Sequence, residues 1–168
     1  MSIIRPFKGI RPRADLASAI AALPYDVYNS EEAREIVLPE PKSFLQIDRA
    51  ETLLPKGTNP YSEAVYKTAS ETLNRMIDEG SFLQDKEPCY YLYALTMNGR
   101  TQTGLVGCAS IDDYCNNVIL KHENTLEAKE QDRIRHIDAC SAQTGPIFLA
   151  YRADKKTRRD HQKRPINT

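Results

Sequence analysis

Hydrophobic positions recur at helical spacing most clearly between residues 60 and 79. Steps of three and four residues place side chains on one face of a helix, so this segment is predicted to be an amphipathic helix. Asn59 suits the N-cap, Pro60 suits the first turn, and Gly80 is placed to end the helix in a left-handed conformation. The apolar face consists of Val65, Ala69, Leu73, Met76 and Ile77. We expect this face to be core rather than a cofactor-binding surface.

Residues 89–111 have the pattern of a β-hairpin. The first half, 89–97, is rich in tyrosine and leucine, which favour strands. Asn98 and Gly99 form a favoured two-residue turn, because both residues tolerate positive φ. Residues 101–111 are predicted to return antiparallel, with Gly104 and Gly107 marking bends or close backbone approaches.

Weaker patterns complete the predicted elements. A short helix capped by Asn29 or Ser30 is expected to run through the apolar residues 36–38. Seven prolines between residues 6 and 60 favour short elements joined by irregular loops. We further predict strands at 43–47, 118–120 and 146–151, and a second helix from about 126 to 142. The fold class expected is α+β, an antiparallel or mixed sheet with helices packed on it.

Composition narrows the class of protein. A chain of 168 residues, 40% hydrophobic and 27% charged, excludes disordered, collagen-like and disulfide-dense proteins and predicts one domain. No apolar run is long enough to cross a bilayer, and residues 1–6 contain no secretory h-region, so we expect a cytoplasmic protein without a membrane partner. The four cysteines form no Cys-x-x-Cys pair, which predicts no zinc site. Cys89 and Cys108 lie in apolar runs and are expected in the core.

Charge is distributed unevenly along a chain that is neutral as a whole. Residues 152–168 carry seven basic and two acidic residues, a net charge of +5, so residues 1–151 carry −5. An acidic body disfavours nucleic acid as a partner, because phosphates require a basic surface. The basic tail is therefore interpreted as a solvated terminus.

The residues most suggestive of chemistry lie around the start of the second predicted helix. His122 and Glu123 follow a short predicted strand, and either Asn124 or Thr125 is placed to cap the helix. Four polar residues then share one helix face, with Ile134 and Ile137 directed to the core. They are Lys129, Asp132, Arg133 and His136. Basic side chains near a helix N-terminus suit a phosphate or carboxylate, with His122 or Glu123 as general acid or base.

The competing interpretation is that this face is the solvated side of an amphipathic helix with weak surface ion pairs, and spacing alone favours it. His122 and His136 lack further ligands, so no metal site is proposed. Asp26 sits in a rigid turn, where it serves either a functional role or a simple Asx-turn, and is a weaker candidate.

Six motifs in this order carry a resemblance to a known family. They are residues 5–12 (RPFKGIRP), 24–27 (PYDV), 43–49 (SFLQIDR), 122–125 (HENT), 129–133 (KEQDR) and 145–148 (GPIF). Over residues 3 to about 153 the chain resembles the family catalogued as domain of unknown function 1015. The resemblance favours a site at His122, Glu123 and the helix face that follows.

The resemblance also implies an activity. Members of that family are more than twice as long, and their second half carries an Asp-Gly-His-His-Arg motif similar to one in the free-serine kinases of the ParB/sulfiredoxin-like superfamily. This implies phosphotransfer to a small hydroxyl substrate such as L-serine, with Mg²⁺ and a nucleotide or pyrophosphate as donor. The present sequence contains no Asp-Gly dipeptide. We therefore expect an amino-terminal portion, with a domain over 1–153 and a basic, disordered tail over 154–168.

The leading hypothesis is a chain that supplies part of a phosphate- or carboxylate-binding site and is inactive without the missing half. His122 and Glu123 are expected at the reacting centre, and Lys129 and Arg133 on the anion of a small anionic or amino-acid substrate. Asp132 is expected to orient His136 or Arg133, and the remaining candidates are Thr125 and Asp26. One alternative is a ParB-like nucleic-acid-binding module. The other is a non-catalytic interaction domain whose exposed strand edge pairs with the missing half.

Overall fold

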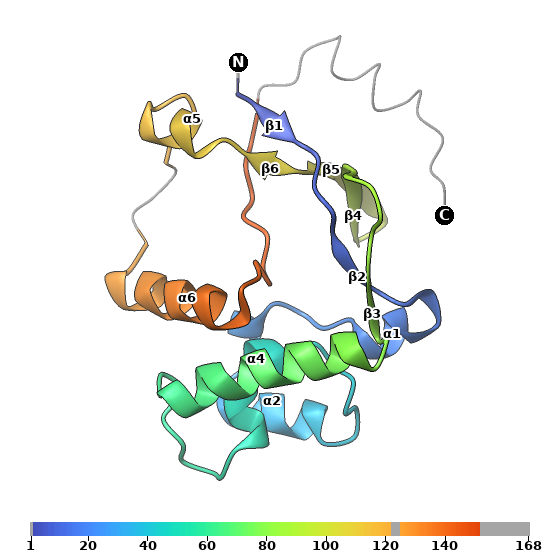
Figure 1. The fold of residues 1–168 in the computed structure, drawn as a ribbon, viewed down its shortest axis with the longest axis vertical. Coiled ribbons are helices and arrows are strands. Elements are labelled where there is room, and N and C mark those ends of the chain that lie inside the picture. The colour runs from blue at the N-terminus through green and yellow to red at the C-terminus, as the bar shows by residue number, and fades with distance from the viewer. Residues whose placement is uncertain (1, 122–124, 152–168) are drawn as a thin grey trace.

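The computed structural model of the chain describes residues 2–121 and 125–151 (Figure 1). The helices are α1 (Ala17–Ile20), α2 (Ser30–Val37), α3 (Leu45–Asp48), α4 (Glu63–Asp78), α5 (Ile111–Cys115) and α6 (Glu127–Cys140), with 3₁₀ turns at Ala14–Leu16, Tyr25–Val27 and Ala50–Leu53. The strands are β1 (Ile4–Arg5), β2 (Ile10–Pro12), β3 (Phe82–Gln84), β4 (Tyr91–Met97), β5 (Arg100–Val106) and β6 (Cys108–Ala109). The predicted α+β class is confirmed. No helix among these residues has both the length and the apolar character to span a lipid bilayer.

The hydrophobic core lies in a helical layer formed by α2, α3, α4 and α6. Figure 1 shows α4 and α6 side by side, while β1, β6 and α5 lie at the opposite end of the molecule; α2 packs against α3 and the 3₁₀ turn Ala50–Leu53. The apolar face predicted for α4 is confirmed, because Val65, Ala69, Leu73 and Met76 are buried in one cluster and Ile77 packs against it. The cluster also takes in Ile20, Ile47, Ala50, Phe82 and Cys140.

Nearby residues explain where helices α2 and α4 begin and end. Asn29 caps α2 as predicted: its side-chain oxygen accepts from the backbone N–H groups of Glu31 and Glu32, and the Glu32 carboxylate accepts from the Asn29 N–H. Helix α4 begins at Glu63 rather than Pro60. The Asn59 side chain instead accepts from the Tyr61 N–H in the turn before the helix. Gly80 follows α4 with φ +72°, as predicted.

The N-terminal segment pairs antiparallel with three different parts of the chain. Strand β1 pairs with β6, Phe7 forms a bridge with Cys89, and β2 pairs with β3. Gly107, just before β6, allows the close approach of β1, because a Cβ there would lie 2.7 Å from Ile4 Cγ2. The close approach predicted at Gly107 is thus confirmed, whereas a Cβ at Gly104 would meet nothing closer than 3.9 Å.

Strands β4 and β5 form the predicted hairpin, with Tyr91 opposite Val106 and Met97 opposite Arg100. The turn residues Asn98 and Gly99 have φ values of +51° and +75°, as a two-residue turn of this kind requires. Large apolar side chains of the hairpin are exposed. They are Leu92, Tyr93, Leu95, Met97 and Leu105.

The base of the hairpin is joined to the N-terminal segment through the Tyr91 hydroxyl. This hydroxyl accepts from the Gly9 N–H at 2.7 Å and donates to the Asp85 carboxylate at 2.6 Å. Arg11 donates two hydrogen bonds to the same carboxylate, at 3.0 and 2.7 Å. The Arg11 guanidinium and the Tyr91 hydroxyl lower the pKa of Asp85 to about 2. A Cβ at residue 9 would lie 2.6 Å from the Tyr91 oxygen, so a larger residue there would displace the Tyr91 hydroxyl from these partners.

Three predicted strands are wrong. Residues 43–47 enter α3, where Leu45 and Ile47 are buried, because a short apolar run suits a buried helical turn as well as a strand. Residues 118–120 and 146–151 are neither helix nor strand. Cys89 and Cys108, expected in the core, are exposed. Cys108 lies in β6, which pairs only with β1, and Cys89 forms an isolated bridge with Phe7. Both cysteines lie outside the helical layer that contains the hydrophobic core.

Candidate functional site

Helix α6 lies with its polar face toward the protein. His136 is only 3% exposed, and its Nε2 lies 3.0 Å from the Ile47 carbonyl oxygen. Cys140, one turn later, is also buried. The Ile134 side chain, expected in the core, is exposed instead. The interpretation of this face as a solvated surface is therefore wrong from Asp132 onward.

Arg133 is held in place by groups from three segments. Its Nε and Nη2 donate to Asp132 Oδ2 at 3.1 and 2.9 Å, so Asp132 contacts Arg133, one of the two partners predicted for it. The other Asp132 oxygen accepts from the Tyr66 hydroxyl of α4 at 2.9 Å. The guanidinium lies over the Tyr25 ring, 4.3 Å from its centroid. These contacts fix the plane of the guanidinium, and the edge that carries Nη1 is not bonded to Asp132.

Asp48, at the end of α3, lies beside that edge. Its Oδ1 is 4.0 Å from Arg133 Nη1 and accepts from the Thr144 hydroxyl at 2.9 Å. Burial raises the pKa of Asp48 above its ordinary value, against the opposing effects of the Thr144 hydroxyl, His136 and Arg133. Burial likewise acts first, and Asp132 second, to raise the pKa of Tyr66 to about 12. A half-buried carboxylate beside a fixed guanidinium is an arrangement common at functional sites.

We call this group of side chains the Arg133 cluster. It consists of Tyr25, Asp48, Tyr66, Asp132, Arg133 and Thr144. Three of the six motifs, at 24–27, 43–49 and 129–133, each supply a member, and Thr144 directly precedes a fourth. Sequence reasoning missed Tyr25, Asp48, Tyr66 and Thr144. A signal was available for Asp48, the one charged residue among residues 44–48 and part of a quoted motif.

The other predicted site residues are placed differently. Lys129 lies one turn before Arg133 on α6 and is exposed. Thr125 is exposed and does not cap α6, because Leu126 occupies the N-cap position. Asp26 is exposed in the first turn of the 3₁₀ segment Tyr25–Val27. His122 and Glu123, with Asn124, lie outside the described residues.

The residues that the structure describes include no group of three or more His, Cys, Asp or Glu side chains arranged to hold a metal ion. Both oxygens of Asp132 are engaged by Tyr66 and Arg133, and Asp48 Oδ1 is engaged by Thr144. Mg²⁺ prefers several oxygen ligands in octahedral geometry. The described part of the chain therefore does not fit a resident Mg²⁺ site.

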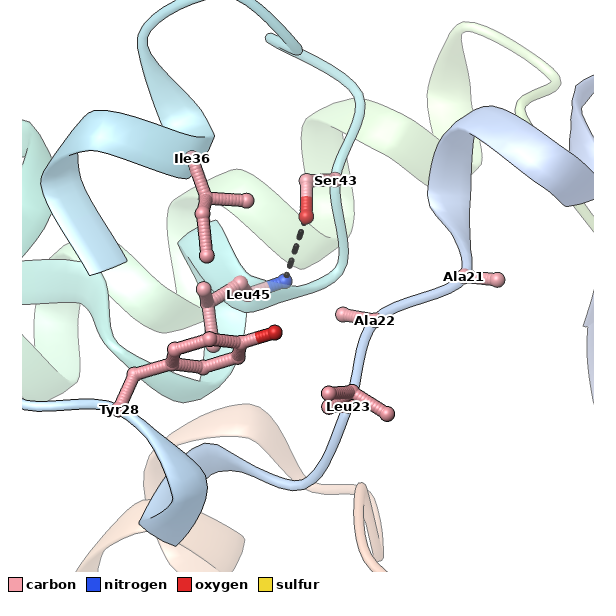
Figure 2. Close-up of a pocket in the computed structure, with 7 residues that line it drawn as sticks. All are labelled: Ala21, Ala22, Leu23, Tyr28, Ile36, Ser43 and Leu45. Carbon is pink, nitrogen blue, oxygen red and sulfur yellow. Dashed lines mark hydrogen bonds between the residues drawn. The ribbon is translucent and has the colours of Figure 1, made fainter. Parts of the chain in front are cut away.

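A shallow cavity of about 330 Å³ lies elsewhere on the helical layer. Figure 2 shows Ala22 and Leu23 on one side of it and Ile36 and Leu45 on the other, with the Tyr28 hydroxyl directed between them. The Ser43 hydroxyl there accepts from the Leu45 N–H at 3.3 Å. None of the charged candidates lines this cavity, so it does not support anion binding.

Comparison with known proteins gives one match. A family model described as "Protein of unknown function (DUF1015)" matches residues 4–164. This range includes all six motifs and continues beyond residue 153, where the resemblance read from the motifs ends. No curated protein and no solved structure matches the chain.

Proposed function

Because this chain belongs to the DUF1015 family of proteins of unknown function, we propose that it supplies an anion-binding subsite of a small-molecule phosphotransferase. The anion is a phosphate or carboxylate group of the donor or acceptor. The reaction type comes from the resemblance to free L-serine kinases, in which a small hydroxyl compound accepts the phosphoryl group. The Asp-Gly-His-His-Arg motif of that resemblance is not among these 168 residues, so the proposal assigns binding, rather than turnover, to this chain.

The observation that carries the proposal is the orientation of Arg133. Asp132 holds Nε and Nη2, and Tyr25 lies against one face of the guanidinium. The side chain keeps 27% of its surface exposed, and Nη1, which is not bonded to Asp132, lies 4.0 Å from Asp48 Oδ1. A guanidinium fixed in one plane loses little conformational entropy when it binds an oxyanion, and its planar fork matches phosphate and carboxylate oxygens.

Lys129 adds a second positive charge on the same side of α6. It lies four residues before Arg133, so the two side chains occupy neighbouring turns of one helix face. Both lie in the first half of α6, whose N-terminal dipole favours an anion. In the proposal Lys129 contributes long-range attraction, whereas Arg133 fixes the geometry of the bound group.

The reacting groups are proposed to be Glu123 and His122, which precede α6 in the chain. A carboxylate removes the proton of the attacking hydroxyl, and an imidazole donates or accepts a proton at the phosphoryl oxygens. These roles rest on the resemblance at residues 122–125. Nucleotide or pyrophosphate is the expected phosphoryl donor on the same basis.

The test is a calorimetric titration of the chain with pyrophosphate. Lys129→Ala is expected to weaken binding about two- to fivefold, because an exposed ion pair contributes about 0.5–1 kcal/mol. Arg133→Lys keeps the charge but loses the planar fork, and about tenfold weaker binding is expected. Lys67→Ala, on an exposed part of α4, is the matched control and should leave affinity unchanged. Equal affinities for all four proteins would contradict the proposal.

A further inference from the structure

The charges of the Arg133 cluster oppose an anion when every carboxyl group is ionised. Asp48 and Asp132 carry two negative charges and Arg133 one positive charge, which leaves a net charge of −1. Both oxygens of the Asp132 carboxylate already accept hydrogen bonds, one from Tyr66 and the other from Arg133. Asp48 is therefore the carboxylate whose ionisation decides whether the cluster attracts an anion.

The imidazole of His136 makes contacts through both ring nitrogens. A carbonyl oxygen only accepts hydrogen bonds, so His136 Nε2 carries a hydrogen and donates to Ile47. The other ring nitrogen, Nδ1, lies 3.9 Å from Cys140 Sγ. Burial raises the pKa of the Cys140 thiol to about 11, so the thiol keeps its hydrogen at neutral pH. These two contacts hold the ring in position.

Asp48 lies beside the Nη1 edge of Arg133, where the anion is proposed to bind. The groups facing Asp48 are Arg133 and His136 of α6, Cys140 at the end of the same helix, and Thr144. An oxyanion bonded to Nη1 at about 3 Å would lie next to Asp48 Oδ1, itself 4.0 Å from Nη1. Two negative groups so close in a half-buried site repel each other strongly.

We propose that an oxyanion binds at the Nη1 edge of Arg133 together with one proton, which Asp48 takes up from solvent. This inference rests on the proposed anion subsite and names how that subsite is regulated. Protonation removes one negative charge, and the cluster becomes neutral. The new carboxyl O–H donates to the bound oxyanion, while the Thr144 hydroxyl turns to the oxygen that still accepts. Anion binding thereby becomes coupled to pH.

The experiment is a sulfate titration followed by calorimetry between pH 5 and pH 8, in two buffers with different heats of ionisation. Sulfate keeps its charge over this range, so any pH dependence belongs to the protein. Above the pKa of Asp48 the dissociation constant is expected to rise about tenfold per pH unit, with about one proton taken up per sulfate bound. Asp48→Asn retains an oxygen for Thr144, and should bind sulfate at pH 8 as tightly as the wild type does at pH 5.

The control variant is Asp78→Asn, which removes one exposed carboxylate from α4 and should keep the wild-type pH dependence. A dissociation constant that does not change with pH, or an Asp48→Asn variant that keeps the full dependence, overturns the proton coupling and leaves the anion subsite standing. Failure of both wild type and Asp48→Asn to bind sulfate at pH 5 overturns the subsite and the coupling together. Thermal unfolding of each variant verifies that it is folded.

Discussion

The helical layer and the β4–β5 hairpin contain similar apolar side chains but cover them very differently. Along α4 the apolar face is buried among α3, α6 and β3. Along β4 and β5, by contrast, leucine, tyrosine and methionine side chains are exposed. The layer is therefore stabilised by burial of apolar surface, whereas the hairpin depends on its backbone hydrogen bonds and on the contacts at its base. Local opening is expected to require less free energy in the hairpin than in the helical layer.

Two methionines allow this difference to be measured with one kind of substitution. Met76 in α4 is 1% exposed and Met97 in the hairpin is 76% exposed. Met76→Ala is expected to lower the free energy of unfolding by about 2–5 kcal/mol, because it leaves a cavity in the core. Met97→Ala should change it by less than about 0.5 kcal/mol. Urea unfolding followed by circular dichroism gives both values, and similar losses would mean that the hairpin is as well packed as the core.

Two glycines of the strand region differ in how closely other atoms approach them, so replacing each with alanine measures the cost of close packing. Gly107→Ala forces a Cβ to 2.7 Å from Ile4 Cγ2 and 3.1 Å from the Arg5 carbonyl oxygen. The expected loss is about 1–3 kcal/mol, typical of overpacking against backbone that has to move. Gly104→Ala, where nothing lies closer than 3.9 Å, should change stability by less than about 0.5 kcal/mol. Thermal unfolding of the two variants tests this, and a larger loss for Gly104→Ala would refute the packing argument.

Acid should weaken the contacts at the base of the hairpin. The pKa of Asp85 is lowered from 3.8 to about 2 in the folded protein. Its contacts with Arg11 and Tyr91 therefore favour the folded state above about pH 4 and are lost as the pH falls from about 4 to 2. Arg11→Gln should raise the pKa of Asp85 toward 3.8, whereas Arg13→Gln, which removes a partner of Asp15, should not. NMR titration of the Asp85 carboxyl group measures this, and a wild-type value near 3.8 would count against it.

The elements that could be predicted from the sequence are those whose signals lie within a few residues. The cap of α2 needs only Asn29 and Glu32 to face each other's backbone groups. The hairpin turn needs only Asn98 and Gly99 at positive φ. In both cases the residues that determine the conformation are neighbours in the chain, so spacing and residue type were sufficient.

The errors lie where distant residues determine the outcome. The apolar run at 43–47 became part of a helix because α4 packs over it, which no local pattern reveals. The polar face of α6 lies against the protein because Asp132 accepts a hydrogen bond from Tyr66 and Arg133 lies over the Tyr25 ring. Each tyrosine is more than 60 residues away in sequence from its partner. The motif residues at 129–133 were correctly singled out, but their surroundings depend on partners that periodicity does not supply. Asp48 lay inside a quoted motif, but its contacts with Thr144 and Arg133 could not be read from the sequence.

The segment from Ile4 to Pro12 has a consequence for the order of folding during synthesis. Its strand partners are Cys108–Ala109, Cys89 and Phe82–Gln84, so this segment leaves the ribosome about a hundred residues before the last of its partners. Contacts so far apart in sequence close slowly. Helices α2, α3 and α4 need no such delay for their contacts with one another, because these helices and the turn Ala50–Leu53 follow closely in sequence. The emerging chain should therefore pack α2, α3 and α4 before the Ile4–Pro12 segment is paired, and that segment is the part that a chaperone would meet unpaired.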